Sequence, residues 1–234
     1  QAMSGLMSIT GDVDGTPHKV GVAISDVIAG LFAHSAILAA LFHAERTGEG
    51  QQLDIALLDS QIAALVNVVS NALVSGQTPG RYGNAHPSIV PYQPFRAADG
   101  EFALAVGNDG QFRQLCALIE HPSWAADPRF ATNPARVAHR DELVRLLNAI
   151  FAAETTRYWV DKLVAAGIPA GIINSVNEML ADPHVQSRNL LHVIDGIPMI
   201  GHPVGFSATP TEIRMPPPAH GQHTDEILRE FGLK

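Results

Sequence analysis

Asp26 is the residue whose type and position first suggest chemistry. It follows Ser25 and lies among apolar residues such as Ile24 and Val27, where burying an unpaired carboxylate would be costly. An aspartate at a helix start is often a capping residue that accepts backbone N–H bonds. The same position also favours a nucleophile, because N–H groups at a helix N-terminus stabilise an anion and orient it toward an activated carbonyl. The local residues leave both interpretations open.

Cysteine and histidine add little further chemistry. Cys116 is the only cysteine and lies in an apolar stretch with helical spacing, so core packing is favoured and no disulfide can form within one chain. A single cysteine that cannot form a disulfide within the chain fits a protein of a reducing compartment. The 11 histidines do not fall at paired ligand spacing beside carboxylates; His220 and His223 lie three apart in a proline-rich segment and are assigned to local structure. We therefore expect no metal.

Composition and charge narrow the class of protein. With 46% hydrophobic and 16% charged residues over 234 positions, the chain is expected to be soluble and globular. A net charge of −8 without a Lys/Arg cluster argues against nucleic acid as a partner, although one phosphorylated ligand needs only a local cation. Polar residues such as His34 interrupt the apolar stretch 20–42, so we expect a buried helix and neither a membrane partner nor a signal peptide. A cytoplasmic location is expected, or the mitochondrial matrix in a eukaryote.

A long helix is predicted to hold Asp26. Ser25 is its expected N-cap, apolar residues recur every three to four positions, and Gly48 ends it, so most of the helix should be buried. Alternating apolar and polar residues predict a short strand over residues 52–56. A second helix is predicted over residues 57–74.

Glycine and proline gather in residues 75–91, which indicates a change of domain. A β-hairpin is predicted over residues 92–96 and 102–106, with Asp99-Gly100 in its turn. Asn133-Pro134 is expected in a turn between helices. Helical spacing recurs in four later stretches, namely residues 111–120, 140–153, 156–166 and 176–181.

Strand signals near the end of the chain are weak and lie at Phe206 and Ile213, within the proline-rich run 197–218. The expected organisation is therefore part of a large domain with long helices in residues 1–80, a small α+β domain in 81–173, and a return segment to the large domain in 174–234.

Several motifs, in this order and spacing, resemble the class III CoA-transferases, the family of formyl-CoA transferase, carnitine CoA-transferase and the α-methylacyl-CoA racemases. The later motifs are most similar to the succinyl-CoA:dicarboxylate branch, which includes glutarate CoA-transferases. The resemblance covers essentially the whole chain. The motifs that carry it are residues 1–11 and 21–26, Arg46-Thr47-Gly48-Glu49-Gly50-Gln51, residues 54–59, 83–93 and 107–112, and His220-Gly221-Gln222-His223-Thr224-Asp225.

The resemblance implies an α/β fold with a Rossmann-like large domain, partial here, a small α+β domain and an interlocked homodimer. It places Asp26 on the family's catalytic aspartate. The implied reaction moves CoA from an acyl-CoA to a small carboxylic acid, through an aspartyl anhydride and an aspartyl-CoA thioester. CoA is then a substrate, and no cofactor is needed.

The resemblance also suggests residues that contact CoA or the acid. Leu57 matches a position against the CoA moiety, although it could be a packing residue. Gly83, Asn84 and His86 match a mobile loop over the active site, and His86 could help to bind an acceptor carboxylate or could be an ordinary exposed loop histidine. The loop is not the poly-glycine type of formyl-CoA transferase, which weakens any inference about formate or oxalate.

Two other functions remain open. A racemase or epimerase of the same superfamily would use the aspartate with a histidine to exchange an α-proton. Alternatively, the chain could be a non-catalytic dimerisation module. The chain begins at Gln1 without Met and is similar to the part of the family that follows its N-terminal portion, so most CoA-contacting residues are expected before Gln1.

Overall fold

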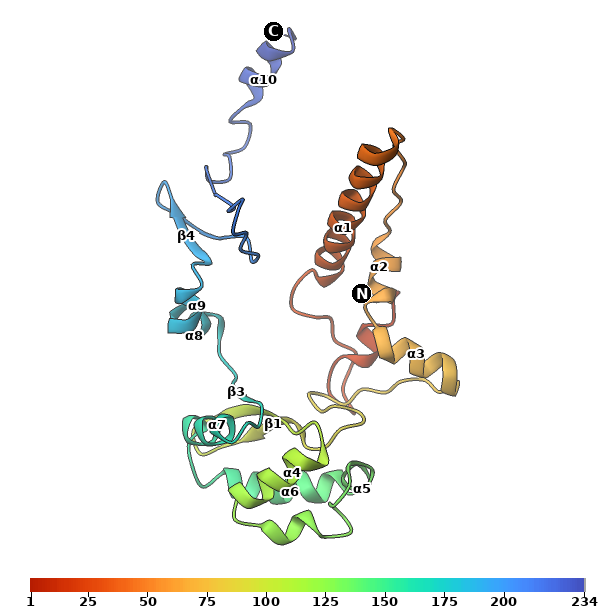
Figure 1. The fold of residues 1–234 in the computed structure, drawn as a ribbon, viewed down its shortest axis with the longest axis vertical. Helices are drawn as coiled ribbons and strands as arrows, with labels where there is room; N and C mark the ends of the chain where they lie inside the picture. Colours follow the sequence, from red (N-terminus) through yellow and green to blue (C-terminus); the bar gives the residue numbers. More distant parts are fainter. Residues whose placement is uncertain (234) are drawn as a thin grey trace. The chain divides into compact units, whose positions relative to one another are not determined.

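The chain forms two separately packed units in a computed structural model, which describes residues 1–233 (Figure 1). The first unit extends from Gln1 to Ile172, and the second begins at Ile173. The break lies one residue before the predicted boundary at 173, and the further boundary at residue 80 stays a prediction.

The long predicted helix is α1, Ile24–Thr47, which follows a short 3-10 helix, η1, Met7–Ile9. Gly48 ends α1 in the left-handed conformation at φ 77°, as glycine permits. The predicted N-cap is wrong: Ala23 precedes the helix without a side-chain cap, and Ser25 lies inside the first turn. Its hydroxyl is bonded instead to a residue of the next helix.

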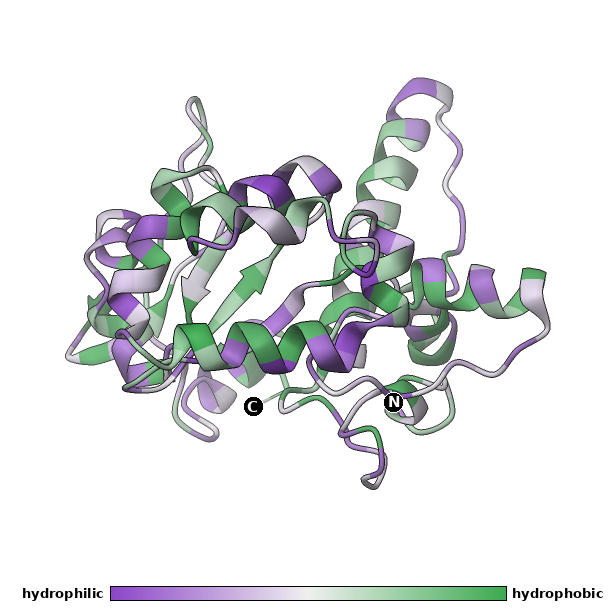
Figure 2. Ribbon diagram, turned by 90° about the horizontal axis from the view of Figure 1, so that it is seen from below, coloured by the Kyte–Doolittle hydropathy of each residue, from purple (hydrophilic) through white to green (hydrophobic). Residues whose placement is uncertain are grey.

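The expected burial of α1 is also wrong. No described residue of the helix is buried, and Leu31 and Leu41 are 63% and 61% exposed. The reason is that, within the first unit, α1 packs mainly against α2, Leu57–Ala63, which leaves most of its side chains uncovered there; Figure 2 shows that α1 is rich in hydrophobic residues. By length and composition α1 could cross a membrane, but a single such helix near the start of a chain is weak evidence for a span.

The predicted second helix is broken in two. It consists of α2 and α3, Val66–Ser75, which bend by 76° at the break. Leu65 at the bend is buried, and Val66 takes a positive φ of 39°, which is unusual for a β-branched residue. The predicted strand over residues 52–56 is absent, because no described strand lies beside it to pair its backbone groups.

A three-stranded antiparallel sheet forms the centre of the later part of this unit. Its order is β1, β2, β3, with bounds Tyr92–Arg96, Glu101–Ala105 and Ala170–Ile172. The predicted hairpin is confirmed: β1 pairs with β2 in the register Phe95 to Phe102, and the turn closes with a 2.8 Å bond from Ala97 N to Gly100 O.

Five helices accompany this sheet, and three of them were predicted with small differences at their ends. The predicted turn at Asn133-Pro134 is wrong, because Pro134 lies in the first turn of a helix, where the missing N–H costs nothing. The helices are α4, Asp109–Leu118; η2, Pro122–Ala125; α5, Asn133–Ala138; α6, Arg140–Phe151; and α7, Thr156–Ala165.

The hydrophobic core lies almost wholly between Val90 and Ile168. Phe151 is at its centre and makes edge-to-face contacts with Phe95, Phe102 and Trp159. In the described residues before Val90, the buried side chains are Ser4, Ser60, Gln61 and Leu65. The helical part therefore buries mainly polar groups.

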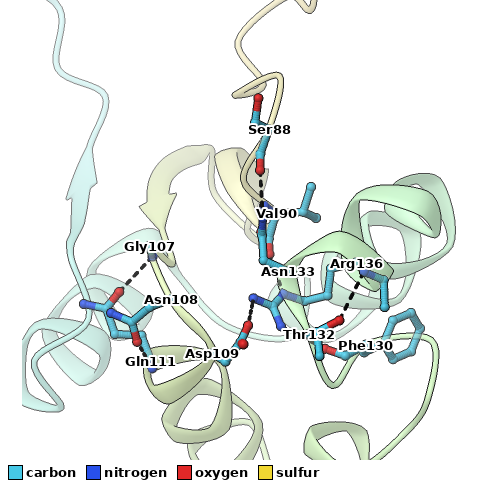
Figure 3. A network of polar contacts seen from close by, with 11 residues as sticks. Ser88, Val90, Gly107, Asn108, Asp109, Gln111, Phe130, Thr132, Asn133 and Arg136 are labelled. Atoms are coloured by element: carbon cyan, nitrogen blue, oxygen red, sulfur yellow. Dashed lines mark hydrogen bonds and ion pairs between the residues drawn. The ribbon is translucent and has the colours of Figure 1, made fainter.

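A buried arginine joins three segments around this core (Figure 3). Arg136 of α5 is 0% exposed, and its guanidinium donates to Val90 O, Phe130 O and the Asp109 carboxylate at 2.6, 2.9 and 2.8 Å. It also lies 4.3 Å from the centre of the Phe112 ring. Each of its nitrogens therefore has a partner, as a buried cation requires.

The second unit contains a predicted helix and an unpredicted hairpin. The helix is α8, Val176–Ala181, which Ser175 and Glu178 close in a capping box. The strand signals at Phe206 and Ile213 are wrong, since both residues are outside regular structure. The remaining elements are α9, Pro183–Ser187; β4, Leu191–Ile194; β5, Ile197–Ile200; and α10, Thr224–Glu230.

Candidate active site

Asp26 lies in the first turn of α1 with its carboxylate free. The residue is exposed, and within residues 1–233 no hydrogen bond or ion pair engages its side chain. The capping interpretation is therefore wrong for this residue. Position and exposure together leave Asp26 available to a ligand, at the end of the helix that favours an anion.

Asp26 lines a pocket of about 700 Å³. The pocket wall is mostly apolar, and among the residues that line it Asp26 and Lys19 are the charged ones. These lining residues come from η1 and the segments before and after it, the first turn of α1, and α2. They are Gln1, Ala2, Met3, Met7, Lys19, Gly21, Val22, Ala23, Ser25, Asp26, Leu57, Leu58 and Gln61.

Two polar contacts hold the pocket wall together. Ser25 Oγ donates a 2.8 Å hydrogen bond to Gln61 Oε1, which ties the first turn of α1 to α2. The Gln1 side chain is hydrogen-bonded to the segment before α1. Its Oε1 accepts from Val20 N at 2.9 Å, and its Nε2 donates to Val22 O at 3.3 Å. The backbone beside Asp26 is therefore fixed although Asp26 itself is free.

Leu57 lies in the same pocket as Asp26. It is the first residue of α2 and is 52% exposed, so its side chain is not a core residue of this chain. The structure thus brings together two of the predicted site residues.

The other three predicted site residues lie elsewhere. Gly83 lines a second pocket of about 360 Å³ between α3 and the loop that follows it. Asn84 is exposed in a turn, and neither it nor His86 lines either pocket. The structure does not bring these three residues to Asp26.

His86 is half-buried and engaged in local contacts. Its ring stacks on Tyr92 with centroids 5.3 Å apart, and its Nδ1 accepts a hydrogen bond from Ser88 N at 3.1 Å. Arg140 Nη2 donates to the carbonyl oxygens of His86 and Pro87 at 2.9 and 3.0 Å. The ring nitrogen Nε2 has no partner in residues 1–233, so it could still meet a ligand.

The segment around Gly83 is tied to a loop near the start of the chain. Gly83 has φ 58°, which glycine tolerates, and its N–H donates to Gly11 O at 3.1 Å. Arg81 donates to the carbonyl oxygens of Asp12 and Gly15 at 3.0 and 2.6 Å. The beginning of the predicted mobile loop is therefore anchored by backbone contacts.

The model of the family described as CoA-transferase family III matches residues 1–224. The chain belongs to this family. It is 48% identical over 240 residues to the succinate–glutarate CoA-transferase of Agrobacterium fabrum, and 41% identical over 234 residues to the succinyl-CoA:glutarate CoA-transferase of Mus musculus. These matches cover 99% and 98% of this chain but 59% and 54% of those relatives.

Solved structures confirm the family fold. A CAIB/BAIF family protein from Brucella suis matches with a TM-score of 0.84 at 40% identity, over 98% of this chain and 61% of that protein. Rv3272 from Mycobacterium tuberculosis matches with a TM-score of 0.83 at 25% identity, over 96% of this chain and 59% of that protein. The predicted α/β fold of the class III CoA-transferases is therefore correct.

Lys19 and Gln61 also line the pocket but are not predicted as site residues from the sequence. Lys19 is in a loop without a recognisable motif. Gln61 carries a signal that could have been used, because it lies four residues after Leu57 and so shares a helix face with it. A glutamine on a helix face that contacts a ligand is as good a candidate binding residue as a leucine on that face.

Other candidate chemistry is absent from the described residues. Residues 1–233 contain no group of three or more His, Cys, Asp or Glu side chains that could hold a metal ion. Cys116 is fully buried, and burial raises the pKa of its thiol to about 11. The pocket beside Asp26 is therefore the site that the structure supports best.

Proposed function

We propose that this protein transfers CoA from an acyl-CoA thioester to a carboxylic acid, with Asp26 as the nucleophile. One observation carries the proposal: Asp26 presents a free carboxylate to a largely apolar pocket at the N-terminus of α1. Membership of CoA-transferase family III and the names of the relatives support it. The carboxylate needs an activated carbonyl as its partner, and a thioester supplies one.

The proposed reaction exchanges the two acyl groups through the enzyme. An Asp26 oxygen attacks the thioester carbonyl carbon, the C–S bond breaks, and a mixed anhydride and CoA thiolate form. The thiolate attacks the aspartyl carbonyl, which releases the donor acid and leaves an aspartyl-CoA thioester. The acceptor carboxylate then attacks the aspartyl carbonyl, the C–S bond breaks, and a new anhydride and CoA thiolate form. The thiolate attacks the acceptor carbonyl, which gives the acceptor's CoA thioester and releases the Asp26 carboxylate. The Asp26 carboxylate is the one enzyme group that forms covalent bonds in this reaction sequence, and the other nucleophiles come from the substrates, so we propose that no metal or cofactor takes part.

We propose succinyl-CoA as donor and a dicarboxylic acid as acceptor. Relatives are named for glutarate and, in Haloarcula hispanica, for mesaconate, and the last is 34% identical over 239 residues. Lys19 supports this choice because it gives the pocket a cation that a second carboxylate could approach. Leu57, the first residue of α2, would contact the apolar part of CoA.

We further propose that the complete enzyme is a homodimer and that Gly83, Asn84 and His86 act in a loop that approaches a bound substrate. The free Nε2 of His86 supports a role in binding the acceptor acid. The chain spans little more than half the length of the relatives, so these contacts belong to the complete gene product.

The test uses the complete gene product that contains this chain. The protein is incubated with succinyl-CoA and glutarate, and glutaryl-CoA is measured by mass spectrometry. Hydroxylamine, added with succinyl-CoA alone, should convert Asp26 to a hydroxamate that peptide mapping detects. Asp26→Ala should lose both signals. Asp59→Ala is the matched control, because Asp59 is exposed in the first turn of α2 and does not line the pocket.

Four results would contradict the proposal. Asp26→Ala could exchange CoA at the wild-type rate, or the hydroxamate could form at another residue. Incubation in deuterated solvent could show α-proton wash-in without CoA exchange, which would favour the racemase. If the complete protein catalysed neither reaction on any acyl-CoA tested, the chain would be a non-catalytic module.

A further inference from the structure

Gln61 is a buried polar residue in the wall of the Asp26 pocket. It is 2% exposed, it lies on α2, and it lines the pocket together with Asp26 and Leu57. Its carbonyl oxygen Oε1 accepts the 2.8 Å hydrogen bond from Ser25, the residue next to Asp26. This bond fixes the side-chain amide relative to the first turn of α1.

The other half of the amide is unused. Gln61 Nε2 has two N–H donors, and within residues 1–233 neither has an acceptor. The nitrogen itself is not fully enclosed, because among the described residues the fully buried side-chain nitrogen or oxygen without a partner is Arg140 Nη1, so solvent or a ligand can reach Gln61 Nε2. Because Gln61 lines the pocket, a ligand bound there could supply the acceptor.

We propose that Gln61 Nε2 donates a hydrogen bond to the carbonyl oxygen of the acyl group that Asp26 attacks. The inference rests on the proposed function and adds a second catalytic residue to it. When the Asp26 oxygen bonds to the thioester carbon, the C=O electron pair moves onto the carbonyl oxygen. It returns when the C–S bond breaks and CoA leaves as a thiolate. The oxygen is most negative between these two events, when a fixed donor stabilises it most.

The rest of the pocket lining favours Gln61 over other side chains for this task. Met3, Met7, Leu57 and Leu58 have no N–H or O–H donor. Ser25 Oγ already donates to Gln61, and Gln1 Nε2 already donates to Val22 O. Lys19 is on an exposed, flexible stem that would have to be immobilised during the reaction. A donor that is already held in place needs no such reorganisation.

The experiment compares Gln61→Glu and Gln61→Met with a matched control in the complete gene product. Gln61→Glu keeps the shape and an oxygen for Ser25 but loses the N–H donors at neutral pH. Gln61→Met removes the donors without adding charge. Gln52→Glu adds the same charge at an exposed position that lines neither pocket.

We expect both Gln61 variants to lower kcat and the rate of hydroxamate formation at Asp26 by about 100-fold, as the loss of one oxyanion donor does elsewhere. KM for succinyl-CoA and the thermal midpoint of Gln61→Glu should change little. The pH dependence of kcat separates this role from a structural one. The kcat of Gln61→Glu, divided by that of wild type, should rise as the pH falls from 8 to 6, because a protonated carboxyl group can donate a hydrogen bond. Gln61→Met and Gln52→Glu should show no such recovery.

The inference fails if either Gln61 variant, folded by circular dichroism, forms the hydroxamate at the wild-type rate. It also fails if Gln61→Glu and Gln61→Met have parallel pH profiles. An inactive Asp26→Ala together with unimpaired Gln61 variants would overturn the role of Gln61 and leave the proposed function standing. An active Asp26→Ala would instead overturn the proposed function itself.

Discussion

Arg136 and Val90 are joined by a hydrogen bond that is shielded from solvent: Arg136 Nε donates to Val90 O at 2.6 Å, and both side chains are fully buried. The bond connects α5 to the segment that enters the sheet. The same guanidinium also donates to Phe130 O and to the Asp109 carboxylate. Its removal would therefore leave several polar groups without a hydrogen-bond partner.

We therefore expect Arg136→Met to lower the free energy of unfolding by about 3 kcal/mol. The side chain of Met fills much of the volume but leaves the carbonyl oxygens of Val90 and Phe130 unsatisfied. The measurement is a urea titration followed by circular dichroism. Arg145→Met, at an exposed position of α6, should change stability by less than about 0.5 kcal/mol. Equal midpoints for the two variants would show that the buried network contributes nothing.

Asp127 and Arg129 give a pH-dependent contact at the surface. Arg129 donates to both Asp127 oxygens, at 3.1 Å from Nε to Oδ1 and 2.6 Å from Nη2 to Oδ2, and these bonds lower the pKa of Asp127 from 3.8 to about 2. The contact stabilises the fold fully above pH 3.8, and this stabilisation is lost as the pH falls through about 2.

Arg129→Leu should return the pKa of Asp127 toward 3.8, as measured by carboxyl carbon chemical shifts in an NMR titration. Arg145→Leu removes an exposed cation of α6 and should leave that titration unchanged. An Asp127 that still titrates near pH 2 without Arg129 would mean that another group lowers its pKa.

Cys116 should be inert in the folded protein. Burial raises the pKa of its thiol from 9.0 to about 11, although the positive charge of Arg136 lowers it in part. We expect no reaction with Ellman's reagent at pH 8 until denaturant is added, whereas Gln114→Cys, at an exposed position of α4, should react at once. Stoichiometric labelling of native Cys116 would contradict its burial.

The same shift gives a prediction about alkaline stability. The neutral thiol is favoured in the fold, so its contribution is complete below pH 9 and is lost as the pH rises through about 11. Cys116→Ser and wild type should therefore differ less in unfolding free energy at pH 10.5 than at pH 8. A constant difference would show that the thiol has the same pKa in both states.

Val66 begins α3 with a backbone conformation that suits glycine. At φ 39° its β-branched side chain is strained, and because the side chain is 66% exposed, little packing would be lost on its removal. We expect Val66→Gly to raise the free energy of unfolding by about 1 kcal/mol. Val69→Gly, inside the same helix, should lower it by about 1 kcal/mol or more. Destabilisation by both variants would rule out strain at Val66.

Local patterns predicted some elements well and others poorly. The hairpin of β1 and β2 could be predicted because alternation and an Asp-Gly turn are properties of adjacent residues. Residues 52–56 have the same alternation but form no strand, since a strand depends on a partner that local sequence does not reveal. The break between α2 and α3 lies in a continuous apolar run, where no glycine or proline marks it.

The candidate site, too, could be predicted from local sequence only in part. The position of Asp26 at a helix start follows from the apolar spacing, but its exposure depends on what packs around α1. Leu57 and Asp26 line the same pocket, but the residues around each of them in the sequence do not predict this. Only the family resemblance or the structure brings the two residues together. The spacing of Gln61 four residues after Leu57 places both on one helix face, but its hydrogen bond to Ser25 could not be predicted from local sequence, because the two residues are 36 positions apart.

The position of the core between Val90 and Ile168 has a consequence for biogenesis. Contacts within such a short span close small loops, so this part of the chain should collapse early during folding. The apolar surface of α1 leaves the ribosome before that core exists, and within residues 1–172 most of it stays exposed afterwards. While the α+β core can already form, we therefore expect α1 to be a segment of the nascent chain that a chaperone holdase binds.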